Sequence, residues 1–260
     1  MFKNILLVYS EKLTEQHISA VESIKGLISK VGIKNKLINV RDLEFKHFAD
    51  RDLVITAGGD GTVIRTAHYI EDVPLLGINS EPEYSEGALT SLKDDEIDSL
   101  SEILLGNYNV LDKERAVAIK NGHVIKERAI NEIYIGTEVQ FATSRYVLKY
   151  RGNEEEQRSS GVLVATAGGS SAWYRSAGGK PFNHEKGKLA FLVREPYFGN
   201  LYQPTLLSGE ILPGESIFFE GKKYGGGIVA IDSNKAYGFN NGDNLEVRIS
   251  NKPLHVLTKK

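Results

Sequence analysis

Residues Leu53–Thr62 read Leu-Val-Ile-Thr-Ala-Gly-Gly-Asp-Gly-Thr. The first three residues form an apolar run, which is typical of a strand buried on both faces. A turn with three glycines follows at once, and we expect a helix from this turn to about Ile70. A buried strand that passes through a glycine-rich turn into a helix predicts an α/β domain with a parallel sheet.

The segments on either side of this stretch continue the same alternation. Apolar runs at Ile5–Val8 and Leu75–Ile78 predict two further buried strands. Between them, Glu15–Ile28 has apolar residues at helical spacing and ends near Gly32. The apolar positions of this expected helix are Ile18, Val21, Ile24, Leu27 and Ile28. We therefore expect a Rossmann-like, mainly parallel α/β domain over residues 1–104.

The pattern changes after residue 104, where helical periodicity gives way to short β-type runs separated by turns such as Asn121-Gly122 and Asn241-Gly242. The expected strands are Ala116–Lys120, Ile130–Gly136, Tyr146–Tyr150, Gly161–Thr166, Ile217–Phe219, Ile228–Ile231 and Leu245–Ile249. The polar run Asn153–Gln157 is interpreted as a hairpin loop. A β-rich second domain is predicted over residues 105–260, with the option that its final segment returns to the first domain.

Composition excludes several kinds of site. The 260 residues carry a net charge of −2, which gives no general signal for nucleic acid or another polyanion. The chain has no cysteine, so disulfides, thiolate nucleophiles and cysteine-ligated metals are excluded. Its six histidines form no His-x-x-x-His pair. No apolar run approaches the roughly 20 residues of a membrane span, and no signal peptide is expected. We expect a cytoplasmic protein without a membrane partner.

The first motif with chemical meaning is the glycine-rich turn. Gly58, Gly59 and Gly61 allow close approach of a ligand to the backbone, and their N–H groups, with Thr62 and the helix N-terminus, predict a phosphate site. Asp60 in the middle of a phosphate site is suited to accept a proton from an attacking hydroxyl or to hold magnesium. The alternative is structural: a tight strand-to-helix turn with Asp60 as the helix N-cap.

Two later motifs suggest a nucleotide ligand. Asn131 and Glu132 interrupt an apolar strand with side chains that can hydrogen-bond a base and ribose hydroxyls, unless they mark a bulge or an edge. The loop Thr166–Gly179 is rich in small residues and lets a ligand lie against the backbone. Trp173 and Tyr174 within it are candidates for a base-stacking wall or for ordinary core packing.

Two other glycine-rich stretches resemble nucleotide-binding motifs but lack the sequence context that those motifs require. Gly178-Gly179-Lys180 is followed by proline, so the chain has no Walker-type loop. The stretch Gly225–Ala230 has the form Gly-x-Gly-x-x-Ala but precedes an expected strand, which favours a hairpin loop over a dinucleotide fingerprint.

Taken together and in this order, the three motifs resemble those of the NAD kinase family, which has Gly-Gly-Asp-Gly, then Asn-Glu, then a Thr-Gly-Ser-rich loop ending in Ala-Gly-Gly. The similarity covers residues 50–250. It is closest to the mitochondrial-type branch and its bacterial relatives, whose Gly-Val-Asn-x-x-Pro-x-x-Ser-Glu-Gly resembles Gly77–Gly87. The resemblance implies an NAD kinase-like fold and phosphoryl transfer from ATP to the adenosine ribose 2′-hydroxyl of NAD, with NADP and ADP as products.

The resemblance also implies roles for particular residues. Asp60 would accept the proton of the 2′-hydroxyl, and Mg²⁺ would bind through the phosphates of ATP. Asn234 is included because Ile231–Asn234 resembles an Asp-Ser-Gln segment of the family. The implied dinucleotide contacts are Arg65, Asn131, Glu132, Arg158, Ser160, Ser171, Ala172, Trp173, Tyr174, Arg175, Ser176 and Asn234. The implied partners are NAD, ATP and further copies of the chain in a homodimer or larger homo-oligomer.

The sequence departs from the family pattern at several positions. Ser160 stands where the larger branch has an aspartate that contacts the dinucleotide. Ala167 replaces proline or glycine, Trp173 replaces tyrosine and Tyr174 replaces serine. Because lipid kinases and phosphofructokinases also have Gly-Gly-Asp-Gly, a lipid-kinase-like enzyme is one alternative, and a dinucleotide sensor without turnover is another. The Asn-Glu pair and the serine-rich loop favour a nucleotide acceptor. The sequence does not decide whether the acceptor is NAD or NADH, or whether the phosphoryl donor is ATP or polyphosphate.

Overall fold

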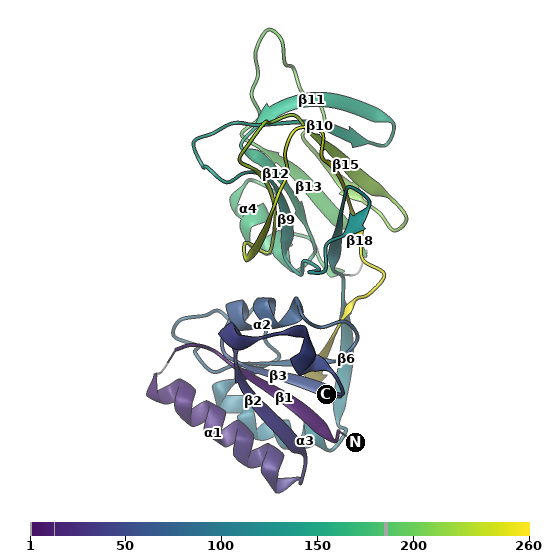
Figure 1. Ribbon diagram of the computed structural model, residues 1–260. Coiled ribbons are helices and arrows are strands. Elements are labelled where there is room, and N and C mark those ends of the chain that lie inside the picture. Colours follow the sequence, from purple (N-terminus) through teal and green to yellow (C-terminus); the bar gives the residue numbers. More distant parts are fainter. Residues whose placement is uncertain (1, 13, 185–186) are drawn as a thin grey trace. The chain divides into compact units, whose positions relative to one another are not determined.

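The structure is a computed structural model that describes residues 2–12, 14–184 and 187–260, and it divides the chain into two units (Figure 1). Unit 1 consists of Met1–Lys113 and Pro253–Lys260, and unit 2 of Glu114–Lys252. The division falls after Lys113 and not after residue 104, because strand β6 (Tyr108–Lys113) pairs with β19 (Leu254–Lys259) in the sheet of unit 1.

Unit 1 is built on a mainly parallel sheet. The order of strands is β2-β1-β3-β4-β19-β6, with β5 beside β4. The pair β19–β6 is antiparallel and the other pairs are parallel. The remaining strands are β1 (Asn4–Tyr9), β2 (Lys34–Asn39), β3 (Leu53–Ala57), β4 (Leu75–Asn79) and β5 (Leu92–Lys93). The α/β class expected for this part of the chain is confirmed.

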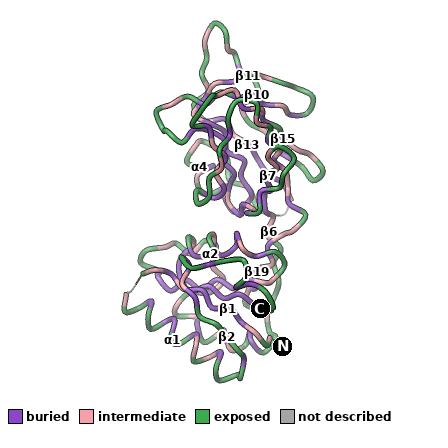
Figure 2. Tube along the Cα trace, in the orientation of Figure 1, coloured by how far each residue is buried: buried purple, intermediate pink, exposed green. Residues whose placement is uncertain are grey.

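The helices of unit 1 pack on this sheet through apolar faces. The helices are α1 (Glu15–Lys30), α2 (Asp60–Ala67) and α3 (Leu100–Leu104), with 3₁₀ turns η1 (Val40–Asp42), η2 (Phe45–Phe48) and η3 (Asp94–Ser99). Thr14 caps α1 by accepting a hydrogen bond from the N–H of His17. The predicted face of α1 is confirmed at Val21, Ile24 and Ile28, whereas Ile18 is exposed. Figure 2 shows both buried and exposed positions along α1.

In its described residues, unit 2 has two six-stranded antiparallel sheets together with the short helical turns η4 (Gly169–Ser171) and α4 (Trp173–Ser176). One sheet has the order β11-β10-β15-β18-β7-β8 and the other β14-β13-β12-β9-β16-β17. The strands are β7 (Ala116–Lys120), β8 (His123–Val124), β9 (Glu132–Thr137), β10 (Ser144–Tyr150), β11 (Asn153–Ser159), β12 (Gly161–Ala165), β13 (Leu189–Arg194), β14 (Ser208–Ile211), β15 (Ser216–Gly221), β16 (Gly227–Ile231), β17 (Lys235–Gly238) and β18 (Asn244–Ile249).

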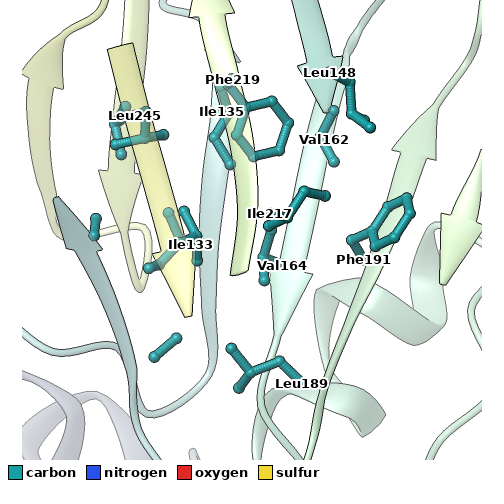
Figure 3. Packing of buried hydrophobic residues seen from close by; sticks show 14 of the residues in the cluster. Ile133, Ile135, Leu148, Val162, Val164, Leu189, Phe191, Ile217, Phe219 and Leu245 are labelled. Atoms are coloured by element: carbon teal, nitrogen blue, oxygen red, sulfur yellow. The ribbon is translucent and has the colours of Figure 1, made fainter. Parts of the chain in front are cut away.

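The two sheets of unit 2 enclose an apolar core (Figure 3). Ile133, Val164 and Phe191 reach into it from one sheet, and Ile217 and Phe219 from the other. Inward side chains of two facing antiparallel sheets define a β-sandwich. The β-rich class predicted for the second part of the chain is confirmed.

The polar run Asn153–Gln157 is a strand and not the hairpin loop expected from its composition. It forms most of β11 and pairs with β10 in the register Lys149↔Glu154 and Tyr150↔Asn153. The turn lies earlier, at Arg151-Gly152, where both residues have positive φ. Because β11 is at the edge of its sheet, several of its side chains face water, and charged residues are tolerated there. Among the described residues, no helix is long and apolar enough to cross a membrane.

Candidate active site

The glycine-rich turn joins β3 to α2 at the carboxyl edge of the parallel sheet. Gly58 has φ +155°, and a Cβ atom there would lie 2.3 Å from Thr62 Oγ1. A Cβ on Gly59 would lie 2.4 Å from Ser85 Cβ, whereas one on Gly61 would meet nothing within 4 Å. The first two glycines are therefore required by packing. Gly61 instead leaves space beside the first turn of α2, where a ligand can approach the backbone.

Asp60 is the first residue of α2, and Gly59 is the N-cap. The structural alternative, in which Asp60 caps the helix, is therefore wrong. Its carboxylate accepts hydrogen bonds from two backbone N–H groups, Leu89 at 2.8 Å and Ala88 at 3.2 Å. The N–H of Asp60 donates to Ser85 Oγ at 3.1 Å. The loop after β4 thus fixes the direction of the Asp60 side chain.

A cavity of about 260 Å³ opens over this turn. Five of the predicted site residues line this cavity: Gly59, Asp60, Gly61, Thr62 and Arg65. The cavity is also lined by residues that were not predicted to belong to a site: Ser10, Glu11, Lys12, Val40, Glu81, Tyr84 and Ser85. Ser10 to Lys12 follow β1, and Glu81 follows β4, so the site collects residues from the carboxyl ends of neighbouring parallel strands, the usual ligand position in such sheets.

Charged side chains surround the cavity in pairs. Ser10 Oγ donates to Glu81 Oε1 at 3.0 Å, and Lys12 Nζ lies 3.8 Å from Glu81 Oε2 and over the ring of Tyr84. Arg65 lines the cavity as predicted, with its guanidinium 3.0 Å from Glu11 Oε1. Lys12 and Arg65 supply cations that can bind phosphate oxygens, and the same lining also holds three carboxylates.

Asn131 and Glu132 lie at the start of β9 in unit 2, held from two sides. Thr166 N donates to Asn131 O at 2.8 Å, and Thr166 Oγ1 donates to Ile130 O. A Cβ on Gly169 would lie 2.1 Å from Asn131 O, so the small-residue loop packs directly on this segment. The second and third motifs of the sequence therefore form one structural group.

The side chains of this pair hold unusual polar atoms. Glu132 is buried, with 4% of its surface exposed. Among the described residues, Asn131 Oδ1 and Glu132 Oε2 are buried side-chain atoms without a hydrogen-bond partner. Burial and the negative charge of Asp232 raise the pKa of Glu132 to about 7, against the opposing hydrogen bond of Ser233. Unpaired buried polar atoms and a perturbed carboxyl group are features of a binding site.

Only some of the predicted dinucleotide contacts in the serine-rich loop are exposed. Ser171, Ala172, Arg175 and Ser176 are exposed. Tyr174, expected as a stacking wall, is instead buried against Phe182 and the core around Ala165. A Cβ on Gly179 would lie 2.1 Å from the Tyr174 ring, which explains the glycine at that position. Tyr174 therefore supports the loop from inside.

Trp173 takes the outer position in this loop. Its ring lies 5.2 Å from that of Tyr134, and the Arg194 guanidinium lies 5.0 Å over it. Arg194 was not among the predicted site residues. Beside Ser171, a cavity of about 550 Å³ is lined by Ala167, Ser170, Ser171, Pro181, Phe182, Asn183 and Lys188.

The remaining predicted contacts have separate surroundings. Arg158 donates to Tyr202 Oη at 2.9 Å and stacks on that ring. Ser160 is held through its backbone, since its N–H donates to Arg194 O and its carbonyl accepts from Tyr134 Oη at 2.7 Å. Asn234 is exposed in the turn between β16 and β17. In that turn, Asp232 accepts hydrogen bonds from the backbone N–H groups of the Asn-Glu pair, and Ser233 hydrogen-bonds the Glu132 carboxyl group. Neither Asp232 nor Ser233 is among the predicted contacts.

No group of three or more His, Asp or Glu side chains suited to a metal ion occurs among the described residues. The donors around Asp60 are carboxylates and hydroxyls, which match the oxygen ligands that Mg²⁺ prefers. Because Mg²⁺ in kinases is commonly bound by one or two carboxylates together with substrate phosphates, this donor set fits a magnesium–nucleotide complex.

The chain is similar to known proteins of one family. Residues 3–105 match the model of the ATP-NAD kinase N-terminal domain. The NADH kinase of Arabidopsis thaliana is 31% identical over 231 residues, which cover 74% of this chain and 68% of that protein. The NAD kinase of Methanosarcina mazei is 30% identical over 222 residues, with coverages of 79% and 69%.

The fold is shared with solved structures of the same kind. An NAD kinase from Archaeoglobus fulgidus in complex with ATP superposes with a TM-score of 0.78 at 19% identity, covering 97% of this chain and 92% of that one. Yeast NADH kinase complexed with NADH gives 0.79 at 16% identity, with coverages of 100% and 84%. With its glycine-rich turn, its Asn-Glu pair and these relatives, the chain belongs to the NAD kinase family.

Proposed function

We propose that this protein is an ATP-dependent NAD kinase, which phosphorylates the 2′-hydroxyl of the adenosine ribose of NAD and releases NADP and ADP. The observation that carries the proposal is the placement of Asp60. Its carboxylate is oriented by two backbone N–H groups at the edge of a cavity whose glycines and cations suit a polyphosphate. Family membership supports the same activity.

In the proposed reaction, Asp60 is the general base. Its carboxylate takes the proton of the 2′-hydroxyl as the hydroxyl oxygen attacks the γ-phosphorus of ATP. The bond between the γ-phosphorus and the bridging oxygen breaks, and the electron pair leaves with ADP. The N–H groups of Gly59 and Gly61, at the N-terminus of α2, stabilise negative charge on the phosphates, together with Lys12 and Arg65. Asp60 then returns its proton to water.

On the acceptor side, Asn131 and Glu132 are proposed to bind the dinucleotide. Their unpaired buried oxygens, Asn131 Oδ1 and Glu132 Oε2, are suited to hydroxyl or amino groups of a nucleoside. Ser171, Ala172 and Ser176 contribute an exposed loop of small residues, and Trp173 with Arg194 contributes a planar surface. Arg158, Ser160, Arg175 and Asn234 are retained as further proposed contacts.

Several finer statements are part of the proposal. Mg²⁺ enters with ATP as part of the donor substrate and neutralises phosphate charge in the transition state. The place within the mitochondrial-type branch, a homo-oligomeric assembly and a cytoplasmic location remain predictions from the sequence. Relatives bear the names NAD kinase and NADH kinase, so both redox forms of the acceptor belong in the test.

The test is a panel of acceptors assayed with ATP and magnesium, following ADP release. The panel contains NAD, NADH, adenosine, a sugar phosphate and a diacylglycerol in micelles. We expect the dinucleotides to exceed every other acceptor by about 10² or more in kcat/KM, because binding of the second nucleotide contributes to the transition state. A lipid or sugar phosphate that outperforms both dinucleotides would refute the proposed acceptor. Binding of NAD without any turnover would favour a sensor.

A further inference from the structure

Asp232 holds the Asn-Glu pair through an unusual set of hydrogen bonds. Its Oδ1 accepts from the N–H of Asn131 at 2.8 Å and of Glu132 at 2.9 Å, while Oδ2 accepts from the N–H of Ile130 at 2.9 Å. The carboxylate is buried, with 6% exposure. One side chain thus binds three consecutive amides at the point where β9 begins. Charge-assisted hydrogen bonds of this kind fix a backbone segment more firmly than neutral ones.

The turn that carries Asp232 has a demanding backbone conformation. Asp232 has φ +48° and Ser233 has φ +52°, and the N–H of Asn234 donates to Ile231 O at 3.0 Å. This is the pattern of a type I′ turn, in which Asn-Gly is favoured at the two central positions. Serine is a poor choice for such a conformation, and residues held in the left-handed region cluster at functional sites. The chain retains this turn where it delivers Asp232 to the Asn-Glu segment.

The side chains of the segment that Asp232 binds include two with unpaired polar atoms. Asn131 Oδ1 and Glu132 Oε2 are buried and without a partner among the described residues. Their backbone is held by Asp232 on one side and by Thr166 on the other. The backbone is therefore fixed while the functional groups of the side chains keep hydrogen-bonding capacity for a ligand.

We propose, on the basis of the function proposed above, that Asp232 is a positioning residue for the acceptor site, whose carboxylate holds the backbone of residues 130–132 so that Asn131 and Glu132 engage the dinucleotide. Asp232 itself is not a catalytic residue, because its carboxylate is occupied by three amides. Its role is distinct from that of Asn234, which is exposed in the same turn.

The charge of Asp232 also affects the pKa of Glu132. This effect distinguishes a positioning role from a purely structural one. Burial and Asp232 together raise the pKa of Glu132 to about 7, and the hydroxyl of Ser233 opposes them. On the other side of β9, the partner of Glu132 is the neutral Ala165 of β12. Glu132 therefore carries a proton part of the time near neutral pH, and it can donate as well as accept a hydrogen bond. Loss of the Asp232 charge lowers the pKa of Glu132.

The experiment compares Asp232→Asn with Asp243→Asn in the full chain. Asp243 is a matched control: it also lies in a turn of unit 2, where its carboxylate accepts from the N–H of Asn240 at 2.8 Å. For Asp232→Asn we expect the KM for NAD to rise by about tenfold, with kcat and the KM for ATP within about twofold. The midpoint of the pH dependence of the KM for NAD should also move to lower pH. Asp243→Asn should change neither quantity.

A double variant tests the link to Glu132. In a Glu132→Gln background, adding Asp232→Asn should produce no further shift of the pH midpoint, because the titrating group is absent. Unchanged KM for NAD in a folded Asp232→Asn protein would overturn the inference. So would equal losses toward NAD and ATP together with a lowered melting temperature, which indicate a purely structural role. Circular dichroism of each variant separates these outcomes.

Failure of the proposed function gives a different result. If wild-type protein shows no NAD turnover, calorimetric titration with NAD alone replaces the kinetic readout. Weaker NAD binding by Asp232→Asn, with wild-type binding by Asp243→Asn, would then support the positioning role without the kinase activity. A wild-type protein that neither binds nor phosphorylates NAD would overturn both.

Discussion

At the scale of single residues, Asp60 supports the sharpest prediction. Asp60→Asn preserves the shape and the hydrogen-bonding oxygen at one position but removes the base. We expect NADP formation to fall by about 10²–10⁴ in kcat, with NAD binding by calorimetry unchanged, because proton acceptance typically contributes a factor of that size. Asp52→Asn is the control, since Asp52 also accepts two backbone N–H groups, from Lys3 and Asn4, outside the cavity. Turnover near the wild-type rate in Asp60→Asn would refute the base assignment.

Glu132 supports a prediction about stability and pH. Its pKa is raised from 4.5 to about 7 in the folded protein, so the folded state holds a proton that the unfolded state has lost. The contribution of Glu132 to stability is therefore complete below about pH 4.5 and is lost as the pH rises to about 7. Glutamine does not titrate. The free energy of unfolding of Glu132→Gln relative to wild type should increase by about 2–3 kcal/mol between pH 4.5 and pH 8.

Urea denaturation at several pH values measures this difference. Glu246→Gln serves as the control, because Glu246 lies on β18 of the same unit and is partly exposed. A difference between Glu132→Gln and wild type that stays constant across the pH range would contradict a raised pKa for Glu132 in the folded state.

At the scale of elements, the turn from β3 to α2 contains two glycines that flank Asp60 but differ in the space around them. A Cβ on Gly59 would lie 2.4 Å from the Ser85 side chain, and the loop after Ser85 holds Asp60. We expect Gly59→Ala to reduce both thermal stability and turnover. Gly61→Ala meets nothing within 4 Å and replaces a helical glycine, so stability should rise by about 0.5–1 kcal/mol.

The same Gly61→Ala variant should bind ATP more weakly if phosphates approach the open face of the turn. Melting temperatures and ATP titrations of the two alanine variants provide the comparison. A Gly61→Ala protein with unchanged ATP affinity would place the phosphates elsewhere.

Elements were predictable from the sequence where their signal is local. The strands β3 and β12 are continuous apolar runs, and the turn at Gly58–Gly61 lies in one contiguous segment. By contrast, β11 has charged side chains at the edge of a sheet, and its strand character comes from pairing with β10. Likewise β6 has mostly exposed residues and is defined by its distant partner β19.

The candidate site divides in the same way. Asp60, Asn131 and Glu132 were identified from their own motifs. The groups that orient them come from distant segments: the amides of Ala88 and Leu89 for Asp60, and Asp232 for the Asn-Glu pair. A single sequence does not state which distant segments meet, so these contacts required the structure. For Tyr174 the sequence left a stacking wall and core packing as alternatives, because an aromatic residue suits both, and the structure places it in a buried cluster.

At the scale of the whole molecule, unit 1 depends on a strand that follows unit 2 in the chain. β19 lies between β4 and β6, and its residues Leu254, Val256 and Leu257 are each at most 3% exposed. Burial of three such side chains is worth roughly 5–9 kcal/mol, which is comparable to the stability of a whole domain. Deletion of Pro253–Lys260 should therefore unfold unit 1 and abolish turnover.

Unit 2 should survive this deletion, because its core is formed within Glu114–Lys252. Limited proteolysis with mass spectrometry tests both expectations: the truncated chain should yield a resistant fragment near residues 114–252 and lose protection of residues 1–113. Deletion of Lys260 alone, which leaves β19 complete, is the control. Equal protection of both units in the truncated chain would show that β19 is dispensable.

The position of β19 also sets an order of events during synthesis on the ribosome. When β18 has emerged, every strand of the sandwich is available, whereas the sheet around Asp60 still lacks a central member. Until Leu254–Lys259 is translated, β6 and the first part of β4 present unpaired edges, which are templates for pairing with other chains. The nascent protein can therefore complete its second half before its first, and the sheet beside Asp60 is the part most exposed to misassembly.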